Sequence, residues 1–184
     1  MKSPVKTGKS EYVEKRSRFL GLAVPVESEE EARAVIASVK KEHHDARHNC
    51  WCYVIGDKIQ RYSDDGEPQG TAGLPMLEVL RKEGVTNAVC VVTRYFGGIL
   101  LGAGGLLRAY TKAAKDALSD AEPEEIISLQ TLEFDCDYSE LENFKLAVAR
   151  YSGTVEDISY GERVRLRIKM PETEEFSKKY LWKK

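Results

Sequence analysis

Two glycine-dense stretches hold most of the residues of this chain that could do chemistry. They are residues 63–75, which are also rich in acidic side chains, and residues 93–110. Glycine loses more backbone entropy on ordering than any other residue, so clustered glycines indicate close backbone approach or positive φ angles. We therefore expect a bound ligand, a nucleic acid phosphate or a neighbouring element of the fold to lie against this backbone.

The second stretch predicts an anion site. It leads into a helix expected over residues 105–118, and free amides at a helix N-terminus attract negative charge. Its spacing is neither that of a P-loop nor that of a dinucleotide fingerprint. The alternative is that the glycines only permit tight packing of a strand against a helix. The residues predicted to contact phosphate here are Arg94, Gly97, Gly98, Gly102, Gly104, Gly105, Arg108 and Lys112.

The first stretch contains an acidic turn formed by Asp64, Asp65 and Glu67. Three close carboxylates could hold a hard cation, but the loop length and terminal Glu of an EF-hand are missing. Asp side chains that cap their own backbone explain the pattern equally well. We interpret the segment as a functional turn that orients Arg94 or another cation, and we predict no metal ion and no cofactor.

A histidine and two cysteines alternate at His48, Cys50 and Cys52, so an extended backbone would place them on one face of a strand. A zinc site would need further ligands, and the chain has no Cys-x-x-Cys pair. A Cys50 nucleophile activated by His48 would need a third, orienting group. We expect buried thiols of the core instead and assign no catalytic residue.

A second row of cations alternates with apolar residues near the end of the chain. Arg163, Arg165 and Arg167, followed by Lys169, would form one cationic face of a strand. Such a face could bind phosphates. The alternative is an ordinary solvated sheet face whose charges are compensated by acids such as Glu156 and Glu162.

Periodicity and turn signals predict the elements that must position these residues. In the first part of the chain we expect strands at residues 18–26, 50–55, 58–62 and 88–93, with helices at 29–41, 75–84 and 105–118. The strand at 88–93 reads as buried on both faces. Ser28 with Glu31 predicts a capping box at a helix start.

The pattern lapses in the acidic, proline-containing segment 120–125 and then restarts. We expect strands at 128–136, 154–160 and 163–169, a helix opened by a capping box of Ser139 with Glu142, and a last helix after Pro171. These patterns predict an α+β chain with a flexible N-terminus at 1–13, one domain at 14–122 and a second at 126–184. The second domain would be a ferredoxin-like half-sandwich that lacks its final strand.

Composition limits the function. The 184 residues carry a formal net charge of −2, so any basic surface must be local, and the chain cannot coat nucleic acid indiscriminately. No secretory signal and no apolar run long enough to cross a bilayer is present, which predicts a cytoplasmic protein without membrane association. Cys50, Cys52, Cys90 and Cys136 show no disulfide framework, so we expect free thiols.

Several motifs together resemble the YigZ/IMPACT family. The likeness extends over about residues 14–118 and is carried by Glu14-Lys15, Ser17-Arg18-Phe19, Asp45, His48, Cys50, Ser63-Asp64-Asp65-Gly66-Glu67-Pro68, Gly70-Thr71-Ala72-Gly73, Thr93-Arg94-Tyr95-Phe96-Gly97-Gly98, Leu101-Gly102 and Gly104-Gly105-Leu106. The resemblance implies a first domain like domain 2 of ribosomal protein S5. It also implies a ferredoxin-like second domain that resembles the last domain of the translocating elongation factor.

The resemblance also implies a role in translational control. The eukaryotic member restrains the kinase that senses uncharged tRNA through a separate N-terminal domain, and we expect no such domain before Glu14. Our first hypothesis is a non-enzymatic regulator that binds structured RNA or the ribosome, with a translation-machinery protein as a possible partner. The alternatives are an enzyme or nucleotide-binding protein that uses the glycine loop and acidic turn, and a protein-only interaction module. The sequence assigns no oligomeric state.

Overall fold

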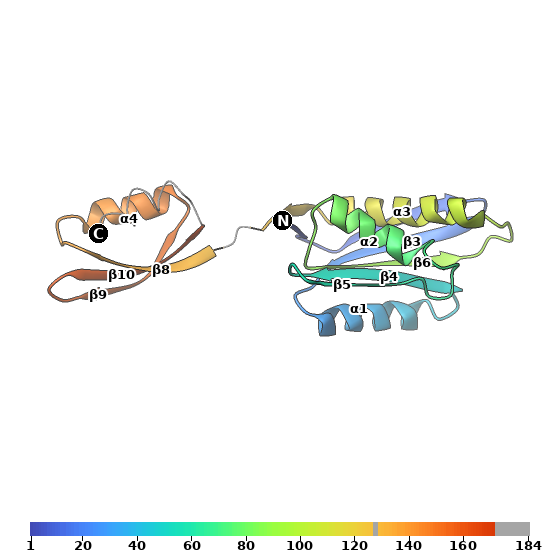
Figure 1. The fold of residues 1–184 in the computed structure, drawn as a ribbon, viewed down its shortest axis with the longest axis horizontal. Helices are drawn as coiled ribbons and strands as arrows, with labels where there is room; N and C mark the ends of the chain where they lie inside the picture. Colours follow the sequence, from blue (N-terminus) through green and yellow to red (C-terminus); the bar gives the residue numbers. More distant parts are fainter. Residues whose placement is uncertain (127–128, 172–184) are drawn as a thin grey trace. The chain divides into compact units, whose positions relative to one another are not determined.

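The chain forms two compact units, residues 1–126 and 127–184, each with its own core. The computed structural model describes residues 1–126 and 129–171, and Figure 1 shows both units as ribbons. Both units mix strands with helices, so the predicted α+β class is confirmed. No helix in the described ranges is long and apolar enough to cross a membrane.

The first unit is built on an antiparallel sheet in which strands distant in sequence become neighbours. Its order is β2-β3-β6-β4-β5, with β2 and β5 at the edges. The strands are β2 (Gly8–Glu14), β3 (Ser17–Pro25), β4 (His48–Ile55), β5 (Ile59–Ser63) and β6 (Ala88–Tyr95). The central strand β6 therefore lies between β3 and β4, and its residues are buried on both faces as predicted.

Helices cover both faces of this sheet (Figure 1). Helix α1 (Glu29–Glu42) packs on one face, while α2 (Gly73–Lys82) and α3 (Gly102–Asp120) pack on the other. Val89 and Val91 of β6 point into the α1 core, whereas Cys90 and Val92 point into the core under α2 and α3. Because successive side chains of a strand point to opposite faces of the sheet, β6 contributes to both cores.

Local signals place most of the boundaries. The hydroxyl of Ser28 accepts a hydrogen bond of 3.2 Å from the amide of Glu31, so the predicted cap of α1 is confirmed. Gly56 turns the chain between β4 and β5 with φ +54°, and Gly84 follows α2 with φ +66°. Both glycines adopt backbone conformations that other residues rarely take.

Residues 1–13, expected to be flexible, contain one short strand and most of a second. Residues 2–4 form β1 (Lys2–Pro4), which pairs with β7 (Pro123–Glu125), and β2 is an edge strand of the main sheet. A Cβ atom at Gly8 would lie 2.1 Å from the carbonyl oxygen of Ala117, so glycine allows β2 to pack directly on α3. Hydrophobic periodicity does not reveal these strands, because much of their side-chain surface faces solvent. Backbone pairing with β7 and β3 fixes them in the fold.

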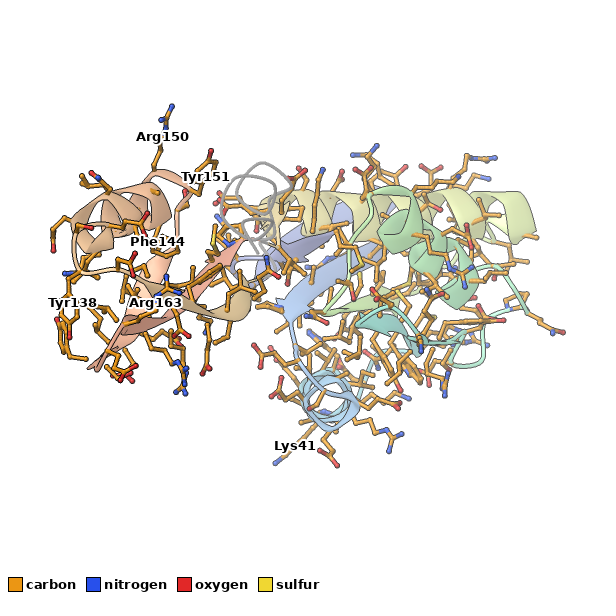
Figure 2. All side chains as sticks on the ribbon, turned by 60° about the vertical axis from the view of Figure 1, so that its left-hand side comes forward. Lys41, Tyr138, Phe144, Arg150, Tyr151 and Arg163 are labelled. Carbon is orange, nitrogen blue, oxygen red and sulfur yellow. The ribbon has the colours of Figure 1, made fainter. Side chains whose placement is uncertain are left out.

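The second unit is a three-stranded antiparallel sheet with one described helix on one face. Its elements are β8 (Leu129–Cys136), α4 (Leu141–Arg150), β9 (Thr154–Tyr160) and β10 (Val164–Pro171), with strand order β8-β10-β9. In Figure 2, Arg150 projects outward from α4, whereas Phe144 belongs to the buried core. The helix predicted after Pro171 lies outside the described residues.

The predicted capping box of α4 is wrong. Glu140 occupies the N-cap position, and no side chain caps the helix. The carboxylate of Glu140 instead accepts a long hydrogen bond of 3.5 Å from the amide of Asp137. The turn before α4 therefore closes one residue later than the Ser139–Glu142 spacing predicted.

Candidate functional site

The site begins at the acidic turn, where Asp64 acts on the backbone. Its carboxylate accepts hydrogen bonds from the amides of Gly70, Ala72 and Gly73, at 2.8, 3.0 and 2.8 Å. These donors are otherwise unsatisfied at the start of α2, and an Asp side chain is a favoured acceptor for such amides. Asp64 thus fixes the loop between β5 and α2, as expected for backbone capping.

Asp65 joins that loop to α1 and β4. Its carboxylate contacts the Lys40 ammonium at 2.6 Å and accepts a 2.7 Å hydrogen bond from the amide of Asn49. Its carbonyl oxygen lies 2.8 Å from Nδ1 of His48. Since a carbonyl can only accept, Nδ1 is the donor. The loop therefore holds the imidazole of His48 in one orientation.

Glu67 is the centre of a buried polar cluster. Its side chain is 3% exposed, and its Oε1 atom accepts hydrogen bonds from Nη1 of Arg94 at 2.6 Å and from the Tyr110 hydroxyl at 2.8 Å. Nε2 of His48 lies 3.9 Å from the same oxygen. A charge so far from water must be paired and hydrogen-bonded, and Arg94 with Tyr110 meets this need. The predicted turn therefore does orient Arg94, through Glu67.

Arg94 is not fully satisfied by this pair. Its side chain is 7% exposed, and its Nε atom is buried without a hydrogen-bond partner among the described residues. The guanidinium lies 5.6 Å from the ring centroid of Phe19 and 5.5 Å from that of Phe96. Buried donors of this kind are rare in folded proteins, so Arg94 marks a position where a further acceptor would be favourable.

A pocket of about 310 Å³ opens beside Arg94, and we call it the Arg94 pocket. Its wall combines buried charge with apolar side chains. The lining residues are Arg47, His48, Gly66, Glu67, Pro68, Arg94, Phe96, Leu100, Leu101, Gly102, Ala103 and Leu106. The acidic turn and the start of α3 therefore do meet in space, on one concave surface.

The glycines of the second stretch divide into two kinds. A Cβ at Gly97 would lie 2.1 Å from the carbonyl carbon of Arg16, so Gly97 serves close packing. Gly98 and Gly102 have φ angles of +83° and +71° with open space around them. Gly102 lines the Arg94 pocket, whereas Gly104 lies in the first turn of α3 outside the lining. Gly105 packs on Leu101.

Helix α3 begins three residues earlier than predicted, at Gly102 rather than Gly105. No hydrogen bond from another described segment satisfies the amides of residues 102–105. Further along the helix, Arg108 is exposed, and Lys112 is paired with Asp116 at 2.6 Å. The predicted cations of α3 therefore lie on its solvent-facing surface, and of the cations predicted to contact phosphate in this stretch only Arg94 lines the pocket.

The cationic face predicted in the second unit exists, but its charges are paired. Each arginine faces an acid on or just after β8, and all of these side chains are substantially exposed. The ion pairs are Arg163 with Asp137 at 3.1 Å, Arg165 with Asp135 at 2.8 Å and Arg167 with Glu133 at 3.0 Å. The hydrogen bond from Arg165 holds the pKa of Asp135 below its ordinary value. This face is therefore charge-balanced.

The cysteines belong to the core. Cys50 and Cys52 are buried under α2 and α3, and the Cys50 thiol donates a 2.9 Å hydrogen bond to the carbonyl oxygen of Asp64. Burial raises the pKa of Cys50, so the thiol stays protonated and is a poor nucleophile. Across residues 1–126 and 129–171 no cluster of metal-binding side chains is present. The expected interpretation of buried thiols agrees with this geometry.

Several residues in and behind the pocket wall were not assigned a role from the sequence. Tyr110 appears in the sequence as one apolar position of an amphipathic helix, and only the fold brings its hydroxyl to Glu67. Arg47 precedes β4 and carries no motif of its own, yet its guanidinium lies 6.0 Å from the ring centroid of Phe96. The sequence signal that could have pointed to this pocket is the position of Phe96 between Arg94 and Gly97.

Comparison with known proteins finds matches to both parts of the chain. Residues 15–118 match the Impact N-terminal domain, and residues 134–179 match a domain of unknown function, DUF1949. IMPACT family member YvyE of Bacillus subtilis is 42% identical over 91% of this chain and 78% of its own length. IMPACT family member YigZ of Escherichia coli is 39% identical over 90% and 84%. A crystal structure described as that of a hypothetical protein matches with a TM-score of 0.67 and 36% identity, covering 97% of this chain and 89% of the other.

Proposed function

The chain belongs to the IMPACT family, and from this membership we propose that it is a cytoplasmic, translation-associated regulator without enzymatic activity. In this proposal it binds structured RNA or the ribosome at the mouth of the Arg94 pocket. The observation that carries the proposal is the Arg94 pocket itself, where the buried guanidinium of Arg94 shares the wall with Arg47 and the start of α3. The link to translation comes from the family resemblance.

The three carboxylates of the acidic turn are all engaged by other groups, which supports binding over catalysis. Asp64 is used by backbone amides, Asp65 by Lys40 and Asn49, and Glu67 by Arg94. A carboxylate already engaged in this way is a poor candidate for a metal ligand or a general base. The cations, by contrast, retain donors that phosphate oxygens could use.

Salt-dependent RNA binding tests the proposal. We expect a structured RNA to bind with an affinity that falls as salt rises, because each phosphate contact contributes about 0.7 to 0.9 to the slope of log affinity against log salt. Replacing Arg47→Glu with Arg108→Glu should lower both the affinity and the slope. The matched control is Arg33→Glu with Lys58→Glu, which makes the same charge change at exposed positions on α1 and in the turn between β4 and β5, outside both the pocket and α3.

Two outcomes would contradict the proposal. One is an absence of RNA binding at low salt. The other is an equal loss of affinity in both double variants, because this would show that only net charge matters. A third pair of substitutions, Arg165→Glu with Arg167→Glu, addresses the paired face of the second unit. Since Asp135 and Glu133 already neutralise those arginines, we expect this pair to weaken binding less than the pocket variant.

A second candidate function is the binding of a phosphorylated small molecule in the Arg94 pocket. The concave shape favours it, because a volume of 310 Å³ lies at the lower end of ligand sites, about 300 to 1,000 Å³. A thermal-shift screen of nucleotides with and without magnesium separates the two functions. A ligand at a hundredfold above its dissociation constant should stabilise the fold by about 2.7 kcal/mol.

In our proposal, each unit also has the fold of a known type of domain. We propose that the first unit has the fold of domain 2 of ribosomal protein S5 and that the second is ferredoxin-like. The element order β8-α4-β9-β10 with strand order β8-β10-β9 supports the second assignment, because a split β-α-β pattern places the third strand between the first two. We further propose functional domains at residues 14–122 and 126–184.

A further inference from the structure

We infer that the Arg94 pocket receives one unpaired nucleotide of the bound RNA, with its base inside the pocket and its phosphate at the mouth. This inference rests on the proposed function and deepens it, because it states which RNA structure the site recognises. Three features carry it: the size and apolar wall of the pocket, the buried charged groups of Arg94 and Glu67 on that wall, and the exposed cations Arg47 and Arg108 near the start of α3.

The apolar wall suits a base and not a bare phosphate. Phe96 is 40% exposed and Leu100 is 81% exposed, although both line a pocket whose floor includes the buried Leu106. Exposed apolar side chains beside a concave site mark a binding surface. The Phe96 ring and the Arg47 guanidinium, 6.0 Å from its centroid, are the two kinds of group on which unpaired bases stack.

The polar side of the pocket suits the hydrogen-bonding edge of a base. Arg94 is almost fully buried and lines the pocket, with Glu67 and His48 beside it on the same wall. Inside a low-dielectric site such groups discriminate strongly, because an incoming ligand that fails to pair with them leaves a buried donor unsatisfied.

The cations outside the pocket suit the backbone of the same nucleotide. Arg47 is exposed at the mouth, and Arg108 is exposed one turn into α3, where its Nη1 atom lies 3.6 Å from the Cβ position of Gly104. Gly102, in a left-handed conformation, exposes the first amides of α3, which attract anions. Cations around an apolar cleft are the pattern by which proteins bind single strands.

These features exclude a base that stays in a duplex. A paired base is stacked above and below, and its hydrogen-bonding edge is occupied by its partner strand. To reach Arg94 the base must already be unpaired or must leave the stack, and leaving the stack costs a few kcal/mol. The pocket therefore favours loops, bulges and single strands over uninterrupted double helices.

Fluorescence anisotropy with a labelled single-stranded RNA, and with the same strand annealed to its complement, tests the inference in the full-length protein. We expect the single strand to bind at least about tenfold more tightly than the duplex, the effect of stacking one base. Phe96→Ala should remove most of this difference by weakening single-strand binding alone. The matched control, Tyr62→Ala, removes an exposed aromatic side chain that does not line the pocket and should leave the difference intact.

The outcomes separate this inference from the function on which it rests. Equal affinity for both RNAs, or an equal loss for both in Phe96→Ala, would overturn the inference alone, because the protein would still bind RNA. If neither RNA binds at low salt, the proposed function fails and the inference falls with it. Circular dichroism of Phe96→Ala and Tyr62→Ala shows whether both variants keep the fold, as expected for exposed positions.

Discussion

At the scale of single residues, the pair of Glu67 and Arg94 connects stability with binding. The pair lies in the interior, and Tyr110 supplies a further hydrogen bond to the same carboxylate oxygen. Burial raises the pKa of Tyr110, so its hydroxyl remains a donor. A buried ion pair is seldom the most stable solution for a core, because both charges lose their hydration. Its presence beside a pocket is consistent with a binding role for Arg94.

Substitution of Arg94→Met should lower the free energy of unfolding of the first unit by about 3 to 5 kcal/mol, because it leaves the Glu67 carboxylate buried without its cation. Urea denaturation followed by circular dichroism measures this loss. The double variant Glu67→Leu with Arg94→Met should recover much of it, since neither charge is then buried. Equal stability of the single and double variants would contradict the importance of the pair.

Thiol chemistry gives a second test at this scale. Burial raises the pKa of Cys50, Cys52 and Cys136, so in the folded protein these thiols stay protonated above about pH 8.5, where a free thiol ionises. We expect iodoacetamide to label the native protein slowly and the urea-unfolded chain rapidly, as measured by mass spectrometry. Rapid labelling of Cys50 in the native state would contradict its assignment to the core.

The same shifts predict the direction of a pH effect on stability. The unfolded chain releases its thiol protons at a lower pH than the folded chain does, so unfolding is favoured as the pH rises through the ordinary thiol range. Below that range both states keep the protons, and the contribution to stability is fully present. Denaturation midpoints measured on either side of that range should therefore fall on the alkaline side, and substitution of Cys50→Ala should reduce this fall.

At the scale of elements, the segment between β6 and α3 shows how one glycine-rich loop serves two purposes. Gly97 allows the loop to approach the turn between β2 and β3, where Lys15 and Arg16 both have positive φ angles. Its amide donates a 3.2 Å hydrogen bond to the hydroxyl of Ser17. Gly102 instead shapes the start of α3 beside the pocket. Gly97 therefore serves close backbone packing, whereas Gly102 serves the open start of α3.

Alanine substitutions separate these two purposes. Gly97→Ala should destabilise the first unit strongly, because the new Cβ would overlap the backbone of Arg16. Gly104→Ala should be tolerated and could stabilise α3 by up to about 1 kcal/mol, since its Cβ would meet only the flexible end of Arg108 and alanine favours helix. Thermal unfolding measures both changes. A large loss of stability in Gly104→Ala would contradict the open space around it.

At the scale of the whole molecule, each unit is a separate structure with its own core, and the N-terminal segment belongs to the first. β1 pairs with β7, and the amide of Ile126 donates a 2.8 Å hydrogen bond to the carbonyl oxygen of Met1. The first unit therefore closes on itself by joining its two ends. β2 also covers one edge of β3 and packs on α3 through Gly8.

Two truncations test this organisation. A fragment of residues 1–126 should unfold cooperatively, because it retains every strand of the five-stranded sheet and all three helices. Removal of residues 1–14 from this fragment should abolish cooperative unfolding or solubility, since it exposes the edge of β3 and the alanines of α3. Circular dichroism and gel filtration measure the result. An unchanged transition after the deletion would restore the expectation of a flexible N-terminus.

The sequence by itself determined most of the elements but not β1, β2 and β7, because hydrophobic periodicity, turn glycines and capping residues act over a few neighbouring positions. It predicted β6 as buried on both faces and placed α1 within one residue. One prediction failed although its local sequence pattern was the same as that of a correct one. Ser28 caps α1, whereas Ser139 does not cap α4, although both precede an acid by three residues.

Only the tertiary structure decided which polar residues share a site. Glu67, Arg94 and Arg47 come from separate segments, and nothing in their spacing indicates that sheet pairing brings them to one pocket or that helix packing places the Tyr110 hydroxyl on Glu67. The arginines of β10 show the reverse case, because their alternation suggested a cationic face until the register placed Asp135 and Glu133 opposite. Which residues pair across a sheet depends on the whole fold, and the electrostatic effect of a charged side chain depends on the charges placed near it.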